Sequence, residues 1–139
     1  MAVAASYQHA ARYRQSQVET ASPAQLVVML YDGAIRFLTV AREKMASGEI
    51  EARHANLLKA QKIVAELLSS LNLKEGGEVA ENLQRVYTYM HGELVDANVN
   101  DRLEPIDDVL HMLRELRESW AAIALQQLGT ANGGADDRN

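Results

Sequence analysis

Four stretches of this chain repeat apolar residues at intervals of three and four positions, and this spacing limits the possible folds more than any other feature. In the third stretch the apolar residues step by four, three, four and three: Leu83, Tyr87, Met90, Leu94 and Ala97. Such spacing places side chains on one face of an α-helix, and no stretch shows the alternation typical of a strand. We expect four amphipathic helices, at about residues 23–45, 49–73, 78–99 and 105–128.

The ends of these helices carry recognisable signals. Ser22, Pro23 and Gln25 form a capping box with a proline in the first turn, which predicts a helix start at Pro23. A glycine that can adopt the left-handed conformation follows the first helix at Gly48. We expect the second helix to end at Gly76-Gly77, the third to end at Asn100-Asp101 and the fourth to start at Pro105. Asn98 and Asp101 are expected to cap the turn between the third and fourth helices.

These signals divide the chain into three parts. Residues 1–22 form a mobile N-terminal arm and the helix start, residues 23–128 the bundle, and residues 129–139 a polar, glycine-rich tail that we expect to be frayed. Because short connections force neighbouring helices to run antiparallel, we predict an all-α, up-down four-helix bundle. No apolar run approaches the roughly 18 residues of a membrane span, so we expect no membrane insertion.

Composition narrows the possible functions. The chain has no cysteine, which excludes disulfides and thiolate metal sites and fits a cytoplasmic location. Its net charge is −5, and Arg12 and Arg14 make the N-terminal arm basic, so the remainder is more acidic still. An acidic body argues against nucleic acid as a partner, since phosphates attract a basic face.

A search for catalytic or metal-binding patterns finds none that is complete. His111 and Glu115 lie one helical turn apart, which favours a surface contact over a metal site. The Glu51-to-His54 spacing fits half of a di-iron site, but the required second copy is missing. No phosphate-binding loop is present. We therefore expect no cofactor, no metal and no enzyme activity.

The first two helices carry more apolar surface than one core-facing stripe requires. Five apolar residues run without interruption from Leu26 to Leu30, and a helix turns about 100° per residue, so they cannot all face inward. Adjacent apolar pairs in the second helix widen its apolar face in the same way. The candidate partner-binding residues of these helices are Leu26, Met29, Leu30, Leu57 and Ile63.

Three covers for this surplus remain open: the N-terminal arm, a second copy of the chain, or a helix of another protein lying in a groove. The arm contains Tyr7 and Tyr13 among small and polar residues. These rings are candidates to cover an apolar slot and to leave it when a partner arrives. The alternative is a disordered leader with incidental tyrosines.

Four motifs, in this order, resemble the flagellar secretion chaperone family FliS: "YRQSQVETASPAQLVVMLYDGAIRFLTVA", "NLLKAQKIVAELLSSLN", "NLQRVYTYMHGELVDANVND" and "DDVLHMLRELRESW". Together they cover nearly everything from Tyr13 to Trp120. The match of the "YxYM" run adds Tyr89 to the candidate partner-binding residues. The acidic Glu93 and Asp96 stand where basic residues are frequent in the family.

The resemblance implies an antiparallel four-helix bundle in the cytoplasm that binds the carboxy-terminal segment of flagellin. Such a protein prevents premature polymerisation of flagellin and holds it for the flagellar export apparatus. The resemblance also implies that an arm carrying Tyr13 covers part of the binding surface until flagellin arrives. We expect Tyr87 and Trp120, which fall on the core-facing stripes, to lie in the core.

Two functions of different classes therefore remain. The first is a flagellin-binding export chaperone without catalysis. The second is a structural or regulatory four-helix bundle that uses the same surface to form a homodimer and has no flagellin client.

Overall fold

The computed structural model describes the backbone of residues 21–136 and the side chains of residues 21–127. Four helices follow one another: α2 (Pro23–Ala46), α3 (Ile50–Ser69), α4 (Leu73–Asn100) and α5 (Glu104–Asp136). Residues 1–20, and with them the predicted arm and its Tyr7 and Tyr13, lie outside the described residues.

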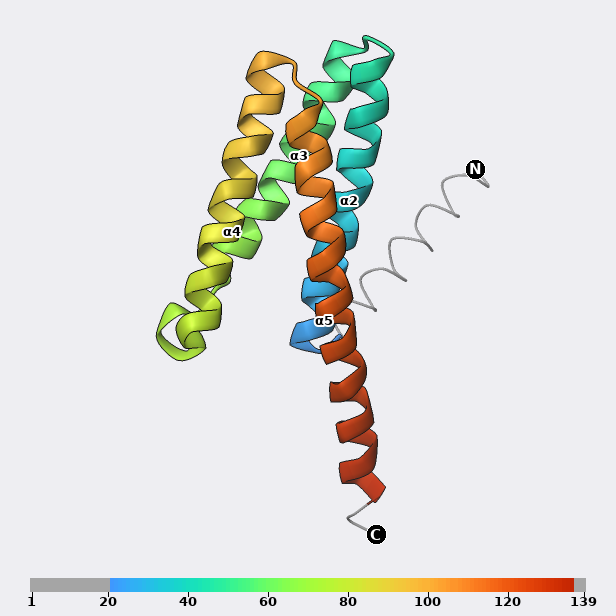
Figure 1. Cartoon of the computed structure of the whole chain (residues 1–139). Helices are drawn as coiled ribbons and strands as arrows, with labels where there is room; N and C mark the ends of the chain where they lie inside the picture. Colours follow the sequence, from blue (N-terminus) through green and yellow to red (C-terminus); the bar gives the residue numbers. More distant parts are fainter. Residues whose placement is uncertain (1–20, 137–139) are drawn as a thin grey trace, which may run out of the picture.

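Successive helices run antiparallel and form the predicted all-α bundle (Figure 1). Helix α2 contacts α3 and α5, and α4 contacts the same two helices from the other side. The turns α2–α3 and α4–α5 lie at one end, which we call the closed end. The start of α2 and the α3–α4 corner lie at the other, which we call the open end.

The start of α2 is the predicted capping box. The Ser22 hydroxyl accepts a hydrogen bond from the backbone N–H of Gln25 at 3.2 Å, and the Gln25 side chain accepts one from the Ser22 N–H at 2.8 Å. These bonds satisfy two of the donors that a helix leaves unpaired at its N-terminus. The sequence signal therefore placed the first helix at the correct residue.

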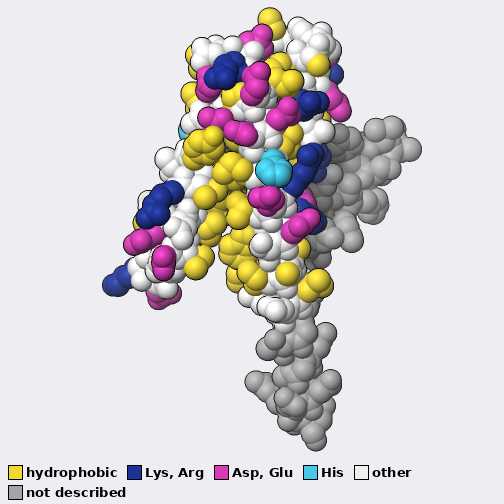
Figure 2. All heavy atoms as spheres, viewed as in Figure 1, with side chains coloured by type: hydrophobic (Ala, Val, Ile, Leu, Met, Phe, Trp, Pro, Cys, Tyr) yellow, Lys and Arg dark blue, Asp and Glu magenta, His cyan; other side chains and the backbone are white. Residues whose placement is uncertain are grey.

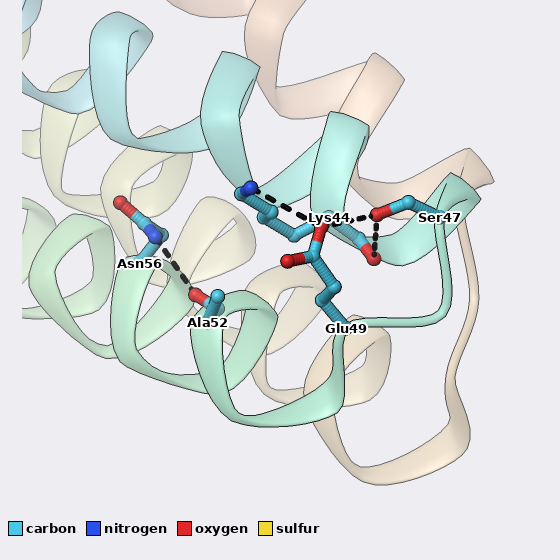
Figure 3. A network of polar contacts seen from close by, with 5 residues as sticks. All are labelled: Lys44, Ser47, Glu49, Ala52 and Asn56. Atoms are coloured by element: carbon cyan, nitrogen blue, oxygen red, sulfur yellow. Dashed lines mark hydrogen bonds and ion pairs between the residues drawn. The ribbon is translucent and has the colours of Figure 1, made fainter.

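The α2–α3 turn at the closed end is also the one expected. Gly48 has a φ of 75°, and the N–H groups of Gly48 and Glu49 bond back to the carbonyls of Met45 and Lys44, which is a Schellman motif. Lys44 and the Ser47 hydroxyl both donate to the Glu49 carboxylate, at 3.1 and 2.7 Å (Figure 3). These donors lower the pKa of Glu49, with Ser47 as the larger cause.

The α3–α4 corner differs in detail from the prediction. Helix α3 ends at Ser69 instead of near residue 73, because the Asn72 side chain caps a new helical turn by accepting from the Glu75 N–H at 3.0 Å. That turn is interrupted at Gly77, whose φ of 57° and ψ of −137° are not helical. The predicted break at the two glycines is thus a kink inside α4.

The α4–α5 turn corrects one predicted cap. Asp101 adopts the left-handed conformation at the end of α4, with a φ of 52°, and its carboxylate accepts from Arg53 of α3 at 2.5 Å. Asn98 does not cap this turn. Its side chain instead hydrogen-bonds Nδ1 of His54 on α3, so it joins two helices.

Helix α5 is longer than predicted. It continues to Asp136, whereas we expected a frayed tail from residue 129. Each residue added to an existing helix gains a backbone hydrogen bond without a new nucleation step, so a helix can continue through a sequence that would not start one. The last turns of α5 extend past the rest of the bundle (Figure 1).

The core lies between the four helices and contains the expected stripe of α4 from Tyr87 to Ala97, while Leu83 and Trp120 are only partly buried. Helix α2 places Tyr31, Ala34 and Leu38 there, fully buried. By length and composition α2 could also cross a membrane, with a mean hydropathy of 1.4 over 18 residues. Our expectation that no stretch approaches a span was therefore too strict; 28% of this stretch is buried inside the bundle.

Candidate functional site: an apolar cleft at the open end

Among the described residues, polar contacts hold α4 to its neighbours only in its second half, where the Tyr87 hydroxyl bonds to that of Tyr31 on α2. Asn98 and Asp101 bond to α3 as described, and the Tyr89 hydroxyl reaches Asp108 of α5 at 3.4 Å. Between residues 73 and 86, the described part of α4 makes no hydrogen bond or ion pair to another described helix. The first half of α4 is therefore held by apolar packing alone.

The core-facing stripes lose their cover towards the open end. On α4 the stripe runs from Met90, which is fully buried, back through Leu83 to Val79, which is 68% exposed. On α5 it runs from the buried Leu113 through the half-buried Trp120 to Ile123, which is 40% exposed. Val79 and Ile123 are thus solvent-accessible where α4 and α5 diverge, while the neighbouring Ala80 and Ala124 stay buried.

A cleft of about 250 Å³ lies at this end of the bundle. Its lining comes from all four helices and the α3–α4 corner: Val27, Leu67, Ser70, Leu71, Asn72, Gly76, Val79, Ala80, Leu83, Tyr87 and Trp120. Hydrophobic side chains follow the trough between α4 and α5 (Figure 2). None of these lining residues is Asp, Glu, Lys, Arg or His.

Tyr87 of the cleft lining is hydrogen-bonded to Tyr31, which is fully buried in the core. The hydroxyls of Tyr31 and Tyr87 lie 2.5 Å apart in a hydrogen bond, and the two rings are tilted by 51° with centroids 6.4 Å apart. Burial raises the pKa of Tyr31 far above the ordinary tyrosine value, and the bond with Tyr87 acts in the same direction. Burial also raises the pKa of Tyr87, so both hydroxyls stay neutral at physiological pH.

The predicted partner-binding residues lie elsewhere than in this cleft. Leu26, Met29 and Leu30 are half-buried on α2, and Tyr89 is 49% exposed on α4. Ile63 is half-buried where α2 and α3 approach closely, since a Cβ on Gly33 would lie 3.2 Å from its Cδ1. Tyr7 and Tyr13 lie outside the described residues.

Leu57 corrects one of these predictions. Its side chain is fully buried in the core, so it offers no surface to a partner in this conformation. Leu57 and Leu58 together widen the apolar face of α3, but only Leu58 is exposed.

Sequence reasoning found several cleft residues but assigned them to the core. Leu83 and Tyr87 lie on the predicted stripe of the third helix, and Trp120 was expected in the core; Tyr87 is indeed buried while Trp120 is only partly so. Val79 was missed, although it continues the α4 stripe by one step of four from Leu83. That spacing was the available signal.

Two further depressions lie on outer faces of the bundle. The one between α2 and α5, of about 360 Å³, contains Arg42 paired with Asp107 at 2.6 Å and the exposed His111, which contacts Glu115 at 3.1 Å as predicted. The one between α3 and α4, of about 310 Å³, is lined by Ala65, Leu68, Ser69, Thr88 and His91. Within the described part of the chain, no three His, Cys, Asp or Glu residues are grouped as a metal site requires.

Comparison with known families gives one match over most of the chain. Residues 5–127 match the family described as Flagellar protein FliS. Proteins named flagellar secretion chaperone FliS are similar over most of their length. The one from Salmonella typhimurium is 37% identical over 111 residues, which is 79% of this chain and 82% of the relative. The one from Vibrio cholerae is 35% identical over 108 residues, 78% and 79% of the two chains.

A relative from Bacillus subtilis with the same name is 32% identical over 108 residues, 78% of this chain and 80% of its own. A solved structure described as a flagellar chaperone from bacteria superposes with a TM-score of 0.70 at 20% identity. The superposition covers 88% of this chain and 98% of that one, and it supports the bundle fold.

Proposed function

Because this chain belongs to the FliS family of flagellar secretion chaperones, which are not enzymes, we propose that it binds the carboxy-terminal segment of flagellin in the open-end cleft. Bound there, the segment is kept from premature polymerisation in the cytoplasm and held for the flagellar export apparatus. The observation that carries this proposal is the exposure of the core-facing stripes at the open end, above all at Val79.

The cleft suits a helical apolar segment. If the apolar stripes served only to form the core, they would stop where the core stops. Val79 and Ile123 continue them as exposed apolar residues. Burying an apolar side chain of this size contributes about 1 to 2 kcal/mol, and several such positions offset the entropy that a disordered tail loses on folding. The half-buried or exposed Leu26, Met29, Leu30, Ile63 and Tyr89 remain proposed contacts for a client that extends beyond the cleft.

Calorimetric titration with flagellin, intact and lacking its carboxy-terminal segment, tests the proposal. We expect binding to the intact protein only. Replacing Val79 by Asp should weaken it at least about tenfold, since a carboxylate would be desolvated in an apolar cleft. Val99 is 74% exposed near the closed end of the same helix, so Val99→Asp is the matched control. Equal binding of truncated flagellin, or equal loss in both variants, would refute the proposal.

We also propose that the arm at residues 1–22 covers this cleft until the client arrives. Helix α2 starts at the open end and Val27 lines the cleft, so the arm joins the bundle beside it. Deleting residues 1–16 should increase binding of an apolar dye to the free protein and tighten client binding. A deletion variant with unchanged dye fluorescence would contradict the proposed cover.

A further inference from the structure

Two neighbouring segments of α2 and α3 contain basic residues but no acidic ones. They are residues 33–42 of α2 and residues 52–65 of α3. They lie next to each other, because the Lys59 ammonium of α3 contacts the Phe37 ring of α2. The whole chain has 19 acidic and 14 basic residues, so two adjacent segments without a carboxylate stand out. Their basic residues are Arg36, Arg42, Arg53, Lys59 and Lys62.

Two of these five cations have carboxylate partners elsewhere in the bundle. Arg42 pairs with Asp107 of α5 at 2.6 Å, and Arg53 pairs with Asp101 after α4 at 2.5 Å. The other three are exposed and make no ion pair with a described residue: Arg36, Lys59 and Lys62. The described part of the chain therefore neutralises only the cations that face α5 and the α4–α5 turn.

The remaining three cations gather around one aromatic ring. The guanidinium carbon of Arg36 lies 5.1 Å from the centre of the Phe37 ring, and the ammonium nitrogen of Lys59 lies 5.3 Å from it. Both distances are within the range of a cation–π contact. Lys62 follows Lys59 by three positions, which places it on the same face of α3. We call Arg36, Phe37, Lys59 and Lys62 the basic patch.

We propose that the basic patch binds a short acidic segment of a partner protein. The ring holds a guanidinium and an ammonium group close together, and like charges at short distance repel each other. Carboxylates of a partner remove this repulsion. A guanidinium that is already held against a ring also loses less side-chain freedom when it donates two hydrogen bonds to a carboxylate.

The size of the patch favours a short protein segment over a long polyanion. The carboxylate-free segment of α2 begins directly after Asp32 and is about 15 Å long, and that of α3 ends directly before Glu66. Residues 73–118, which include most of α4 and the first half of α5, contain eleven acidic and five basic residues. Nucleic acid or an anionic membrane would meet this negative charge beyond the patch, whereas a segment with a few carboxylates fits within it.

The basic patch is separate from the open-end cleft. None of its four residues lines the cleft, and the cleft lining contains no charged side chain. The two surfaces therefore select partners by different chemistry, and this proposal does not depend on the flagellin proposal.

Fluorescence anisotropy with a labelled peptide made of glutamate and leucine tests the patch. We expect the peptide to bind, with an affinity that falls as sodium chloride is added. Lys59→Glu should weaken binding at least about tenfold, since an attraction becomes a repulsion. Lys74→Glu makes the same change in net charge at an exposed lysine of α4, so it is the matched control and should bind like the wild type. A wild-type protein that does not bind the peptide, or equal losses in both variants, would overturn the proposal.

The same assay separates the classes of anionic partner. Labelled single-stranded DNA and vesicles that contain phosphatidylglycerol should bind more weakly than the peptide. Tighter binding of either one would overturn the assignment to a protein segment.

Calorimetric titration with flagellin tests whether the patch is separate from the client site. Lys59→Glu should bind flagellin as the wild type does, because none of the patch residues lines the cleft. Weaker flagellin binding by this variant would show that the patch belongs to the client site, and it would overturn the proposal of a separate partner.

Discussion

At the scale of single residues, the Tyr31–Tyr87 pair is the main polar feature of an otherwise apolar interior. Each hydroxyl is buried and each has the other as its hydrogen-bond partner. Removing one partner leaves a buried polar group unsatisfied, which costs more than the bond itself contributes. Removing both replaces a polar pair by an apolar one of nearly the same shape.

Tyr31→Phe and Tyr87→Phe should therefore each destabilise the protein by about 1 to 3 kcal/mol, whereas the double variant should lose less than the sum. Urea unfolding of the four proteins, arranged as a double-mutant cycle, measures the difference. Additive losses would mean that the two hydroxyls are not coupled.

The same pair predicts a loss of stability at high pH. Burial raises the pKa of Tyr31 in the folded protein, so the unfolded chain gives up this proton first, from about pH 10. The contribution of the neutral hydroxyl to stability is complete below that pH and falls as the pH rises further. Unfolding free energies from about pH 8 to about pH 11.5 should decline less steeply in Tyr31→Phe than in the wild type. Parallel curves would contradict this assignment.

At the scale of helices, Gly77 and Gly92 of α4 differ in whether their backbone conformation requires a glycine. Gly77 makes the kink at the α3–α4 corner with a positive φ, a conformation that strains any residue with a Cβ. Gly92 lies in regular helix on an exposed face, and a Cβ there would meet no atom within 4 Å. One glycine is required by its backbone and the other is not.

Gly92→Ala should stabilise the protein by about 0.5 to 1 kcal/mol, and Gly77→Ala should destabilise it by at least about 1 kcal/mol. Thermal unfolding of the two variants beside the wild type measures both signs. A stabilising effect at Gly77 would show that the kink is not needed.

Helix starts were predictable from sequence where the signal is local. Ser22 and Gln25 satisfy backbone donors within three residues, and Gly48 adopts a conformation that other residues adopt only at a cost. Each signal involves only neighbouring residues, so the local sequence is enough to predict it. The ends of α3 and α5 were not predictable in this way. Helix α3 ends early because the Asn72 side chain caps the start of α4. The length of α5 depends on the helix already formed before its last turns.

At the scale of the whole molecule, the helices of the bundle pack closely at the closed end, whereas α4 and α5 diverge at the open end. Val79 and Met90 lie on the same stripe of α4, yet one is exposed and the other buried. Spacing alone cannot separate them, because their difference arises from the divergence of α4 and α5. This is why the sequence predicted a surplus of apolar surface but assigned it mainly to α2 and α3.

Hydrogen exchange should reproduce this difference between the ends. Backbone amides of α4 near Val79 should exchange faster than those near Leu94, since local opening is easier where few contacts hold a helix. Mass spectrometry of peptides from the two halves measures it. Equal protection along α4 would indicate that both ends are held alike.

The uncharged lining of the cleft also sets how its occupancy should depend on temperature and salt. Association through neutral surfaces is little affected by ionic strength, in contrast to recognition by ion pairs. Transfer of apolar groups out of water gives a negative change in heat capacity, and the driving force weakens on cooling. Whatever occupies this cleft should therefore be released more readily in the cold than by added sodium chloride.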